Sequence, residues 1–400
     1  MIPFSPPKID QKVIDEVVEA LRSGWITTGP KTAEFEKRIS DFVGIDNVLC
    51  VNSCTSGLYL MLKWYGVGPG DEVIVPAYTY CATANVVLHC GATPIMADIK
   101  SDFTIDIEKL NIGSKTKAII PVDLGGLPCD YDELISLLNS KETKDIFESN
   151  NDIQKELGRP MLLADAAHSI GAVYRGRQIG NWADATCFSF HAVKNLTTAE
   201  GGAVCLNLPS GFNNETIYND LRIKSLHGQT KDALAKTKLG GWEYDIIEAG
   251  FKFNMPDVLA AIGLVEIDRY EETLLKRKEI FDIYTDKLSN HDWAILPDYF
   301  NEIKTSSFHL YLLRISGFDE NKRNMLIEKM SHKGIATNVH YKPLPLLSLY
   351  KNLGYKIEDY PMSFLYYRQE VTLPVYYDLT KEDALRVVDS LIEVVNRIND

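Results

Sequence analysis

The stretch Asp184-Ala-Thr-Cys-Phe-Ser-Phe-His-Ala-Val-Lys194-Asn-Leu-Thr-Thr-Ala-Glu-Gly-Gly-Ala-Val204 contains two strand-like runs, 185–190 and 203–206. The loop between them carries Lys194 and the pair Gly201-Gly202. A lysine that is shielded from water loses its proton and becomes a nucleophilic amine, which can form a Schiff base. The alternative is a loop lysine that extends into water, which describes most single lysines. Other motifs of the sequence are needed to decide between these two interpretations.

A carboxylate lies upstream, at the end of another strand-like run. Residues 161–164 are apolar, and Asp165 follows them directly. The carboxyl ends of buried strands are where open α/β sheets bind their ligands. An ionised Asp165 at such a place could hold the ring proton of pyridoxal phosphate, a cofactor that also needs a lysine. Asp165 could instead cap the following segment, but together with Lys194 it favours the cofactor.

These motifs are similar to those of a known family. The segment from Asp165 to His168 and the segment from Ser189 to Gly202 resemble the DegT/StrS-type sugar aminotransferases, a fold-type-I pyridoxal phosphate family. The resemblance extends from Gly24-Trp-Ile-Thr-Thr-Gly29 to Leu373-Pro374, and the lysine segment is its most specific part. Ala199 is a departure, because the family often has glycine before Glu-Gly-Gly.

The resemblance implies a role for each matching residue. Lys194 would carry the cofactor and act as the catalytic acid and base. Asp165 would balance the ring nitrogen, and His168 would contact the ring hydroxyl, where many relatives have glutamine. Tyr80 would stack on the ring, in place of the more usual phenylalanine or tryptophan. Ser189, five residues before the lysine, would bind the cofactor phosphate.

A second group of phosphate ligands is expected where a strand at 47–51 runs through Asn52-Ser-Cys-Thr-Ser-Gly57 into a helix. Free backbone N–H groups and the helix dipole favour an anion at a helix start. The hydroxyls of Thr55 and Ser56 can add hydrogen bonds. An ordinary helix cap needs the same residues, so the sequence alone leaves both interpretations open. The resemblance places the cofactor phosphate here.

Three further residues are candidates at the edge of the site. Asn254 matches the asparagine with which the family reaches the neighbouring subunit's cofactor phosphate, although a helix-capping asparagine fits the sequence equally well. Trp25 lies in a loop that the family brings near the active site, and plain packing is the alternative. His340, with Tyr341 beside it, lies where the family brings polar groups toward the sugar, and a structural histidine is the alternative.

The pattern of elements predicts an α/β fold. Seven strand-like segments are mostly separated by helical ones, which indicates a mainly parallel seven-stranded sheet with helices on both faces. We expect a large cofactor-binding domain at 1–265 and a smaller α+β C-terminal domain at 266–400. In the smaller domain the pattern predicts strands at 309–315 and 336–341 and a final helix at 381–398.

Composition restricts the function classes. The chain has 400 residues and a formal net charge of −13, which argues against binding to nucleic acid or to an anionic membrane surface. The seven cysteines have no paired metal spacing, so we expect no metal site and a reduced, cytoplasmic protein. No apolar run approaches the roughly 20 residues that span a membrane.

The expected function is that of a pyridoxal phosphate-dependent aminotransferase. By resemblance, it would transfer an amino group from glutamate to a keto group of a nucleotide-linked deoxysugar, with C4 favoured over C3 or a cyclitol. The product would enter surface polysaccharide or glycoconjugate synthesis, and the enzyme would be a homodimer with shared active sites. The related sugar dehydratases carry histidine in place of Lys194. A non-catalytic regulator on the same scaffold is another alternative. A nicotinamide dehydrogenase would want a Gly-x-Gly-x-x-Gly loop, which residues 52–57 do not form.

Overall fold

A seven-stranded sheet forms the centre of the molecule. The computed structural model describes residues 1–230 and 243–399. The sheet strands are β1 (Asn47–Val51), β2 (Glu72–Pro76), β3 (Thr93–Ala97), β4 (Thr116–Ile119), β5 (Met161–Asp165), β8 (Ala185–Ser189) and β9 (Gly202–Leu206). Their spatial order is β1-β9-β8-β5-β4-β2-β3. These strands occupy all seven segments that the sequence predicts, so the expected α/β fold is confirmed.

The sheet is mainly parallel. The pairs β8–β5, β5–β4, β4–β2 and β2–β3 are parallel, whereas β9 runs antiparallel to both β1 and β8. The carboxyl ends of β2, β4, β5 and β8 therefore meet at one edge of the sheet. Ligands of open α/β sheets bind at this kind of edge.

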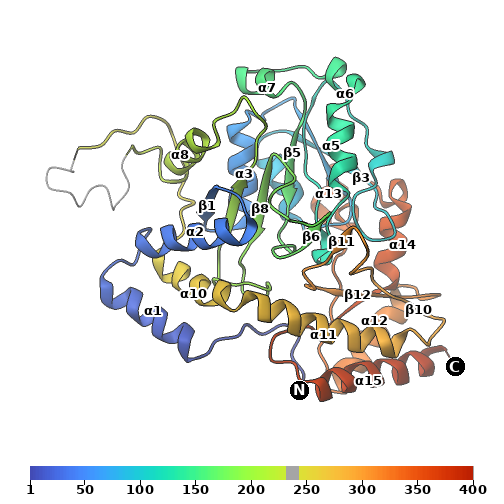
Figure 1. Cartoon of the computed structure of the whole chain (residues 1–400). Coiled ribbons are helices and arrows are strands. Elements are labelled where there is room, and N and C mark those ends of the chain that lie inside the picture. Colours follow the sequence, from blue (N-terminus) through green and yellow to red (C-terminus); the bar gives the residue numbers. More distant parts are fainter. Residues whose placement is uncertain (231–242, 400) are drawn as a thin grey trace.

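Helices cover both faces of the sheet (Figure 1). The helices up to the first long C-terminal one are α1 (Gln11–Ser23), α2 (Pro30–Val43), α3 (Cys54–Trp64), α4 (Ala82–His89), α5 (Tyr131–Asn139), α6 (Lys141–Ile146), α7 (Asp152–Leu157), α8 (Asn214–Ser225), α10 (Asp257–Asp268) and α11 (Tyr270–Leu288). Alternate residues of β1 show the two layers. Leu49 and Val51 pack on the side of α3, α4 and α8, whereas Val48 and Cys50 pack on the side of α2, α5 and α10.

The C-terminal part has its own small sheet and core. Its elements are β10 (Ala294–Ile295), β11 (Lys304–Thr305), β12 (Tyr311–Ile315), α12 (Glu320–His332), α13 (Ser348–Asn352), α14 (Pro361–Gln369), β13 (Glu370–Leu373) and α15 (Lys381–Asn399). The sheet order is β10-β12-β13. Helices α11, α12 and α15 pack on it, and Ile2 from the other end of the chain joins this core. Figure 1 accordingly shows the N-terminus beside α15.

The strand expected at 336–341 is wrong. Within this segment Asn338 makes an isolated bridge to Thr372, and the sheet takes β13 as its third strand instead. The bridge uses both backbone groups of Asn338, after which the chain turns away from the sheet. The turn places His340 and Tyr341 at the edge where β2, β5 and β8 end, because both side chains line the cavity described below.

The C-terminal part is joined to the rest by strand pairing and by ion pairs. Strand β11 pairs with β6 (Val173–Tyr174), which also pairs with β7 (Arg177–Gln178). Lys304 on β11 is 6% exposed, and its Nζ lies 2.8 Å from Asp130 Oδ1 and 3.4 Å from Asp102 Oδ2. The domain division at 265/266 stays a prediction, and these contacts link its two sides.

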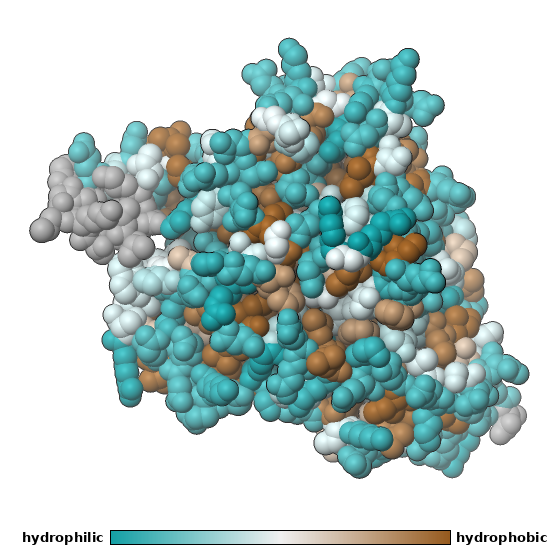
Figure 2. Space-filling model, viewed as in Figure 1, coloured by the Kyte–Doolittle hydropathy of each residue, from teal (hydrophilic) through white to brown (hydrophobic). Residues whose placement is uncertain are grey.

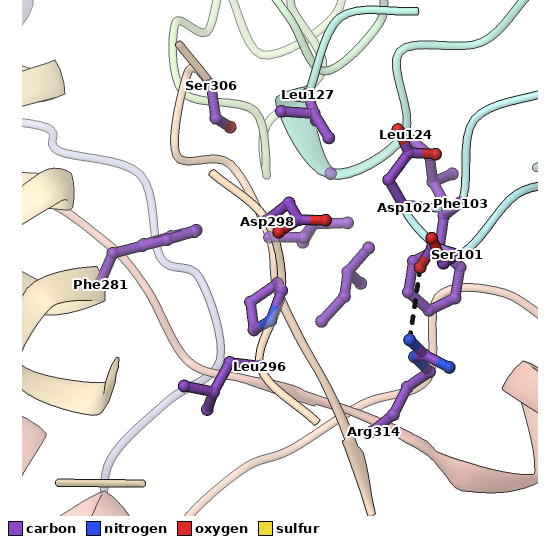
Figure 3. A pocket seen from close by; sticks show the side chains of 14 residues that line it. Ser101, Asp102, Phe103, Leu124, Leu127, Phe281, Leu296, Asp298, Ser306 and Arg314 are labelled. Atoms are coloured by element: carbon purple, nitrogen blue, oxygen red, sulfur yellow. Dashed lines mark hydrogen bonds between the residues drawn. The ribbon is translucent and has the colours of Figure 1, made fainter. Parts of the chain in front are cut away.

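A small cavity also lies at this junction (Figure 3). Its lining includes Ser101 and Phe103 from the segment after β3 and Leu296 and Arg314 from the C-terminal part, and the Arg314 guanidinium donates a hydrogen bond of 3.4 Å to the Ser101 carbonyl. Its volume of about 20 Å³ leaves room for about one water molecule. This cavity is too small for a cofactor or a sugar.

The face of the molecule seen in Figure 2 is mostly hydrophilic. Figure 2 shows hydrophobic residues in separate small patches between polar ones. Within residues 1–230 and 243–399, no helix is both long and apolar enough to cross a membrane. The large apolar side chains lie mainly in the two layers beside the central sheet and in the C-terminal core.

Candidate active site

A cavity of about 350 Å³ lies at the carboxyl ends of β2, β5 and β8, next to the start of α3. It brings together segments that are far apart in the sequence. The predicted site residues that line it are Thr55, Tyr80, Asp165, His168, Ser189, Lys194 and His340. Ser56, Asn254 and Trp25 lie outside this lining.

Lys194 is half-buried and lies in the loop between β8 and β9. Burial lowers the pKa of its amine to about 8, although the Asp165 carboxylate opposes this shift. In the described part of the chain, no hydrogen bond or ion pair occupies Nζ. The amine is therefore available in its nucleophilic form near neutral pH.

Asp165 is the last residue of β5 and is 6% exposed. The Thr83 hydroxyl donates to Oδ2 at 2.7 Å, and the Ala167 backbone N–H donates to Oδ1 at 3.3 Å. Burial raises the pKa of Asp165, and these hydrogen bonds and Lys194 oppose the rise. A positive charge inside the cavity would stabilise the ionised form of a carboxylate held in this way.

His168 is held at both ring nitrogens. The Gly125 N–H donates to Nδ1 at 3.1 Å, so the neutral ring carries its proton on Nε2, which lies 3.2 Å from the Tyr341 hydroxyl. Burial keeps the pKa of His168 well below its usual value, so the ring is neutral. His309 packs against it at 4.6 Å between ring centres. Because His168 donates to Tyr341, the tyrosine proton is free to point toward a ligand.

The phosphate end of the predicted site lies at the start of α3. Ser53 caps the helix by accepting the Ser56 N–H at 3.1 Å, and it also lines the cavity. The Ser56 hydroxyl donates to Asn52 Oδ1 at 2.7 Å and does not line the cavity. Thr55, by contrast, lies in the lining. Of the two hydroxyls expected from the helix start, the structure therefore brings Thr55 into the cavity and uses Ser56 locally.

Glycine is required where β9 passes the helix start. A Cβ added to Gly202 would lie 2.5 Å from the backbone nitrogen of Cys54 and 2.7 Å from the carbonyl oxygen of Phe188. These contacts are with backbone atoms and could not be relieved by a side-chain movement. Gly202 therefore allows the start of α3 to approach the end of β8, where Ser189 faces the same cavity.

Tyr80 forms part of the outer wall of the cavity. Its side chain is 59% exposed, and its ring centre lies 5.6 Å from that of Tyr341. The ring is thus accessible on the cavity side, as a stacking partner for a flat ligand must be. The exposure leaves room for a second chain or a ligand to cover it.

Asn254 and the Trp25 loop lie together outside the cavity. Asn254 Nδ2 donates to the Thr28 hydroxyl at 2.6 Å, and Lys252 Nζ donates to Asn254 Oδ1 at 2.6 Å. Trp25 is half-buried in the same loop, which ends at Gly29. Neither side chain reaches the cavity of its own chain. The expectation that Asn254 serves the neighbouring subunit stays a prediction.

Several contacts in and around the cavity could not be predicted from the sequence. Thr83 holds Asp165, Tyr341 contacts His168, and Asn195 Oδ1 lies 2.7 Å from His309 Nδ1. Their partners are distant in sequence, so no local spacing relates them. Only for Asn195 could the sequence have indicated a role, because it is next to Lys194. Its amide is buried and therefore needs a hydrogen-bond partner.

The cavity fits pyridoxal phosphate. It offers an amine with a pKa lowered to about 8, a buried carboxylate for a cationic ring nitrogen, an accessible aromatic ring and a helix start with hydroxyls for a phosphate. The glycine at position 202 leaves the helix start close to the strand ends. Each requirement is met by a residue of this cavity, so the residues present suit the cofactor.

Comparisons with known proteins identify the family. The model of the DegT/DnrJ/EryC1/StrS aminotransferase family matches residues 7–392. SpsC of Bacillus subtilis (strain 168), a spore coat polysaccharide biosynthesis protein, is 36% identical over 404 residues, which cover 98% of this chain and 97% of SpsC.

Solved structures of similar proteins share the whole fold. Spr1654 from Streptococcus pneumoniae, assigned as a sugar aminotransferase, is 45% identical in its PMP-form, with a TM-score of 0.96 and 100% of both chains covered. Its PLP-form is 44% identical, with a TM-score of 0.94 and 99% of both chains covered. PseC of Helicobacter pylori, an aminotransferase involved in the biosynthesis of pseudoaminic acid, is 27% identical, with a TM-score of 0.85 and 99% of both chains covered. This chain therefore belongs to the DegT/DnrJ/EryC1/StrS aminotransferase family and is a pyridoxal phosphate-dependent sugar aminotransferase.

Proposed function

We propose that this enzyme transfers an amino group from glutamate to the C4 keto group of a nucleotide-linked deoxysugar, with Lys194 as the cofactor-bearing residue. The observation that carries the proposal is the pairing of the Lys194 amine and the Asp165 carboxylate in one cavity. The first supplies a nucleophile and the second a negative charge. An aminotransferase needs both at its cofactor.

Bound pyridoxal phosphate supplies an aldehyde that condenses with amines and a ring that withdraws electrons from the neighbouring bonds. Lys194 would hold the cofactor and, when released, take up and return a proton at the reacting carbon. Asp165 would keep the ring nitrogen protonated through its charge. Ser189, Thr55 and the N–H groups at the start of α3 would hold the phosphate.

Two aromatic residues and a histidine would orient the ring. Tyr80 would cover one face of it, as its accessible position allows. The ring hydroxyl would be met by His168 together with Tyr341, because the His168 Nε2 proton is already directed to the tyrosine oxygen. His340 would face the sugar from the same wall. These roles add a contact with the ring hydroxyl for Tyr341, which the sequence places only beside His340.

The cavity volume supports a substrate that lies only partly inside. A volume of about 350 Å³ is near the lower end for small-molecule sites and has to hold the cofactor as well. We infer that the sugar ring enters and that the nucleotide lies at the rim. SpsC acts in spore coat polysaccharide biosynthesis and PseC in pseudoaminic acid biosynthesis. A product for surface polysaccharide or glycoconjugate synthesis is consistent with both.

We also infer a homodimer in which Asn254 and Trp25 serve the neighbouring subunit. Their position outside the cavity of their own chain supports this, since a role at a cofactor then requires a second chain. Two-fold symmetry would place each Asn254 at the other subunit's site. We assign the reaction to the cytoplasm, because all seven cysteines are free thiols.

The test is a screen of keto-sugar nucleotides against the enzyme loaded with pyridoxamine phosphate. Return of the pyridoxal spectrum, with product structure determined by NMR, reports amination directly. Matched C4-keto and C3-keto isomers of one deoxysugar separate the two positions. We expect turnover with a C4-keto substrate and with glutamate as donor. Turnover restricted to C3-keto sugars, or none with any keto sugar, would contradict the proposal.

A further inference from the structure

A chain of three side chains runs from the cavity into the C-terminal core. His340 lines the cavity, and its Nδ1 lies 2.8 Å from the Thr372 hydroxyl. That hydroxyl donates to Glu370 Oε1 at 2.5 Å, and the backbone N–H of His340 donates to Glu370 Oε2 at 2.9 Å. Thr372 and Glu370 are both fully buried on β13, two residues apart and thus on the same side of the strand.

The hydrogen bonds of this chain depend on one another. When Glu370 is ionised, it accepts the Thr372 proton, so Thr372 can only accept from Nδ1–H of His340. His340 then presents a bare Nε2. When Glu370 is protonated, it can donate to Thr372, which donates to Nδ1, and His340 carries its proton on Nε2. Within the described residues, no hydrogen bond reaches Nε2, so this atom is left for a ligand.

We propose that Glu370, acting through Thr372, sets which nitrogen of His340 carries the proton and so stores a proton for chemistry in the cavity. Glu370 and Thr372 are positioning residues, and His340 is the residue that meets the substrate. This deepens the role of His340 and rests on the proposed function only for the identity of that substrate.

The surroundings of Glu370 are suited to this role. The charged and titratable groups that face it are Arg323 from α12, Tyr78 from the loop after β2, and His340 and Tyr341 from the loop that follows residue 339. The guanidinium of Arg323 donates to the backbone carbonyls of Tyr367 and Glu370 and to Asn324, so these bonds do not use the carboxylate. Burial raises the pKa of Glu370 to about 8, against the opposing effects of Thr372, His340 and Arg323.

The same burial disfavours a charged His340. Its pKa is lowered to about 3, first by burial and then by Lys194, so the ring exchanges protons without becoming imidazolium. When Nε2 of His340 takes a proton from the substrate, the Nδ1–H bond breaks. The proton released from Nδ1 passes to the Thr372 oxygen. The Thr372 proton passes to Glu370 Oε1. Charge and protons balance: the carboxylate becomes a neutral acid, and the reverse sequence returns the proton to the cavity.

The tautomer can be measured directly by ¹⁵N NMR of histidine-labelled holoenzyme between pH 6 and 10, with His340 assigned from its loss in His340→Gln. As the pH rises through the pKa of Glu370, the His340 signals should change from the Nε2–H to the Nδ1–H pattern. In Glu370→Gln and Thr372→Val the change should be lost, whereas Thr372→Ser should retain it. Thr337→Val is a matched control, because its buried hydroxyl has no hydrogen-bond partner among the described residues.

Turnover gives a second readout. In Glu370→Gln and Thr372→Val, kcat should fall by at least about tenfold, as for loss of acid–base assistance, with little change in KM. Thr372→Ser and Thr337→Val should stay near wild type. A single His340 tautomer across the pH range in wild type, or an unchanged pH response in Glu370→Gln, would overturn the proposal. The NMR experiment needs no sugar substrate, so its outcome is independent of the outcome of the substrate screen.

Discussion

The Lys194 amine has a pKa lowered to about 8 by burial, and the nearby Asp165 carboxylate opposes that shift. The neutral fraction of a base rises about tenfold per pH unit below its pKa and levels off above it. The rate at which the apoenzyme binds pyridoxal phosphate should therefore rise up to about pH 8 and then level. In Asp165→Asn the midpoint should move to lower pH, because the charge that raises the lysine pKa is gone. The binding rate is followed by cofactor absorbance. A wild-type midpoint near the ordinary lysine pKa would contradict this prediction.

Asp165→Asn should reduce catalysis far more than stability. Burial already raises the pKa of this carboxyl, and an amide of the same size can still pair with the Thr83 hydroxyl. The thermal midpoint of the apoenzyme should therefore be unchanged or higher. Loss of the charge facing the cofactor ring should lower kcat by about a hundredfold to a thousandfold.

Asp123→Asn is the matched control for this variant. Asp123 is equally buried but lies outside the cavity lining, where it accepts hydrogen bonds from Ser169, Cys129 and Tyr131. This substitution should affect unfolding more than kcat. Near wild-type turnover in Asp165→Asn, or equal losses in the two variants, would show that Asp165 is not the partner of the ring nitrogen.

Single residues could be predicted where their surroundings are local in sequence. Lys194 and Asp165 directly follow strand-like runs, so their placement at one sheet edge follows from the sheet itself. Ser56 is expected at the phosphate, but its hydroxyl donates to the side chain of Asn52 and does not line the cavity. The contact between Tyr341 and His168 could not be predicted, because the two residues lie on different elements and their contact depends on how the two parts of the chain pack.

At the scale of elements, the start of α2 depends on a residue of α10. Asp257 is 1% exposed and accepts from the backbone N–H groups of Gly29 at 2.7 Å, Lys31 at 3.0 Å and Thr32 at 2.9 Å. Asp257→Ala would leave all three N–H groups without this acceptor. Its cost in the free energy of unfolding, measured by urea denaturation, should be about 2 kcal/mol, the upper end for loss of a helix cap.

Asp319→Ala provides the comparison. Asp319 caps α12 by accepting one backbone N–H, that of Lys322 at 2.9 Å, and it is only half-buried. Its loss should cost about 1 kcal/mol, the typical value for a single cap. If Asp257→Ala lowered the free energy of unfolding no more than Asp319→Ala does, Asp257 would not stabilise the start of α2 more than a single cap.

Elements were predictable where hydrophobic patterning was strong. Strands such as β5, buried along its whole length, appear in the sequence as short apolar runs. The segment 336–341, in which polar residues outnumber aliphatic ones, makes only a single bridge at Asn338, and His340 lies at the cavity, so the expected strand does not form. Its place is taken by β13, whose polar residues Glu370 and Thr372 are buried, so its polar/apolar alternation does not separate a solvent face from a core face.

At the scale of the whole molecule, the position of Asn254 predicts sharing of active sites between chains. It contacts Thr28 and Lys252 instead of its own cavity. Lys194→Ala should be inactive, and we expect an Asn254 variant such as Asn254→Ala to be severely impaired. Mixed dimers should regain activity, because one of their two sites has both residues intact. After random mixing, about a quarter of wild-type activity should return. No recovery in verified mixed dimers would place Asn254 and Lys194 in the same chain's site.

The most direct test of the whole account is where the cofactor attaches. Among the described residues, Lys194 is the one lysine that lines the cavity, together with Asp165 at the end of β5. Borohydride reduction of the holoenzyme, followed by peptide mapping, should place the reduced cofactor on Lys194 with near-complete yield. Lys194→Ala should remain folded and give no such label. A label on another lysine, or none in enzyme saturated with pyridoxal phosphate, would contradict the account.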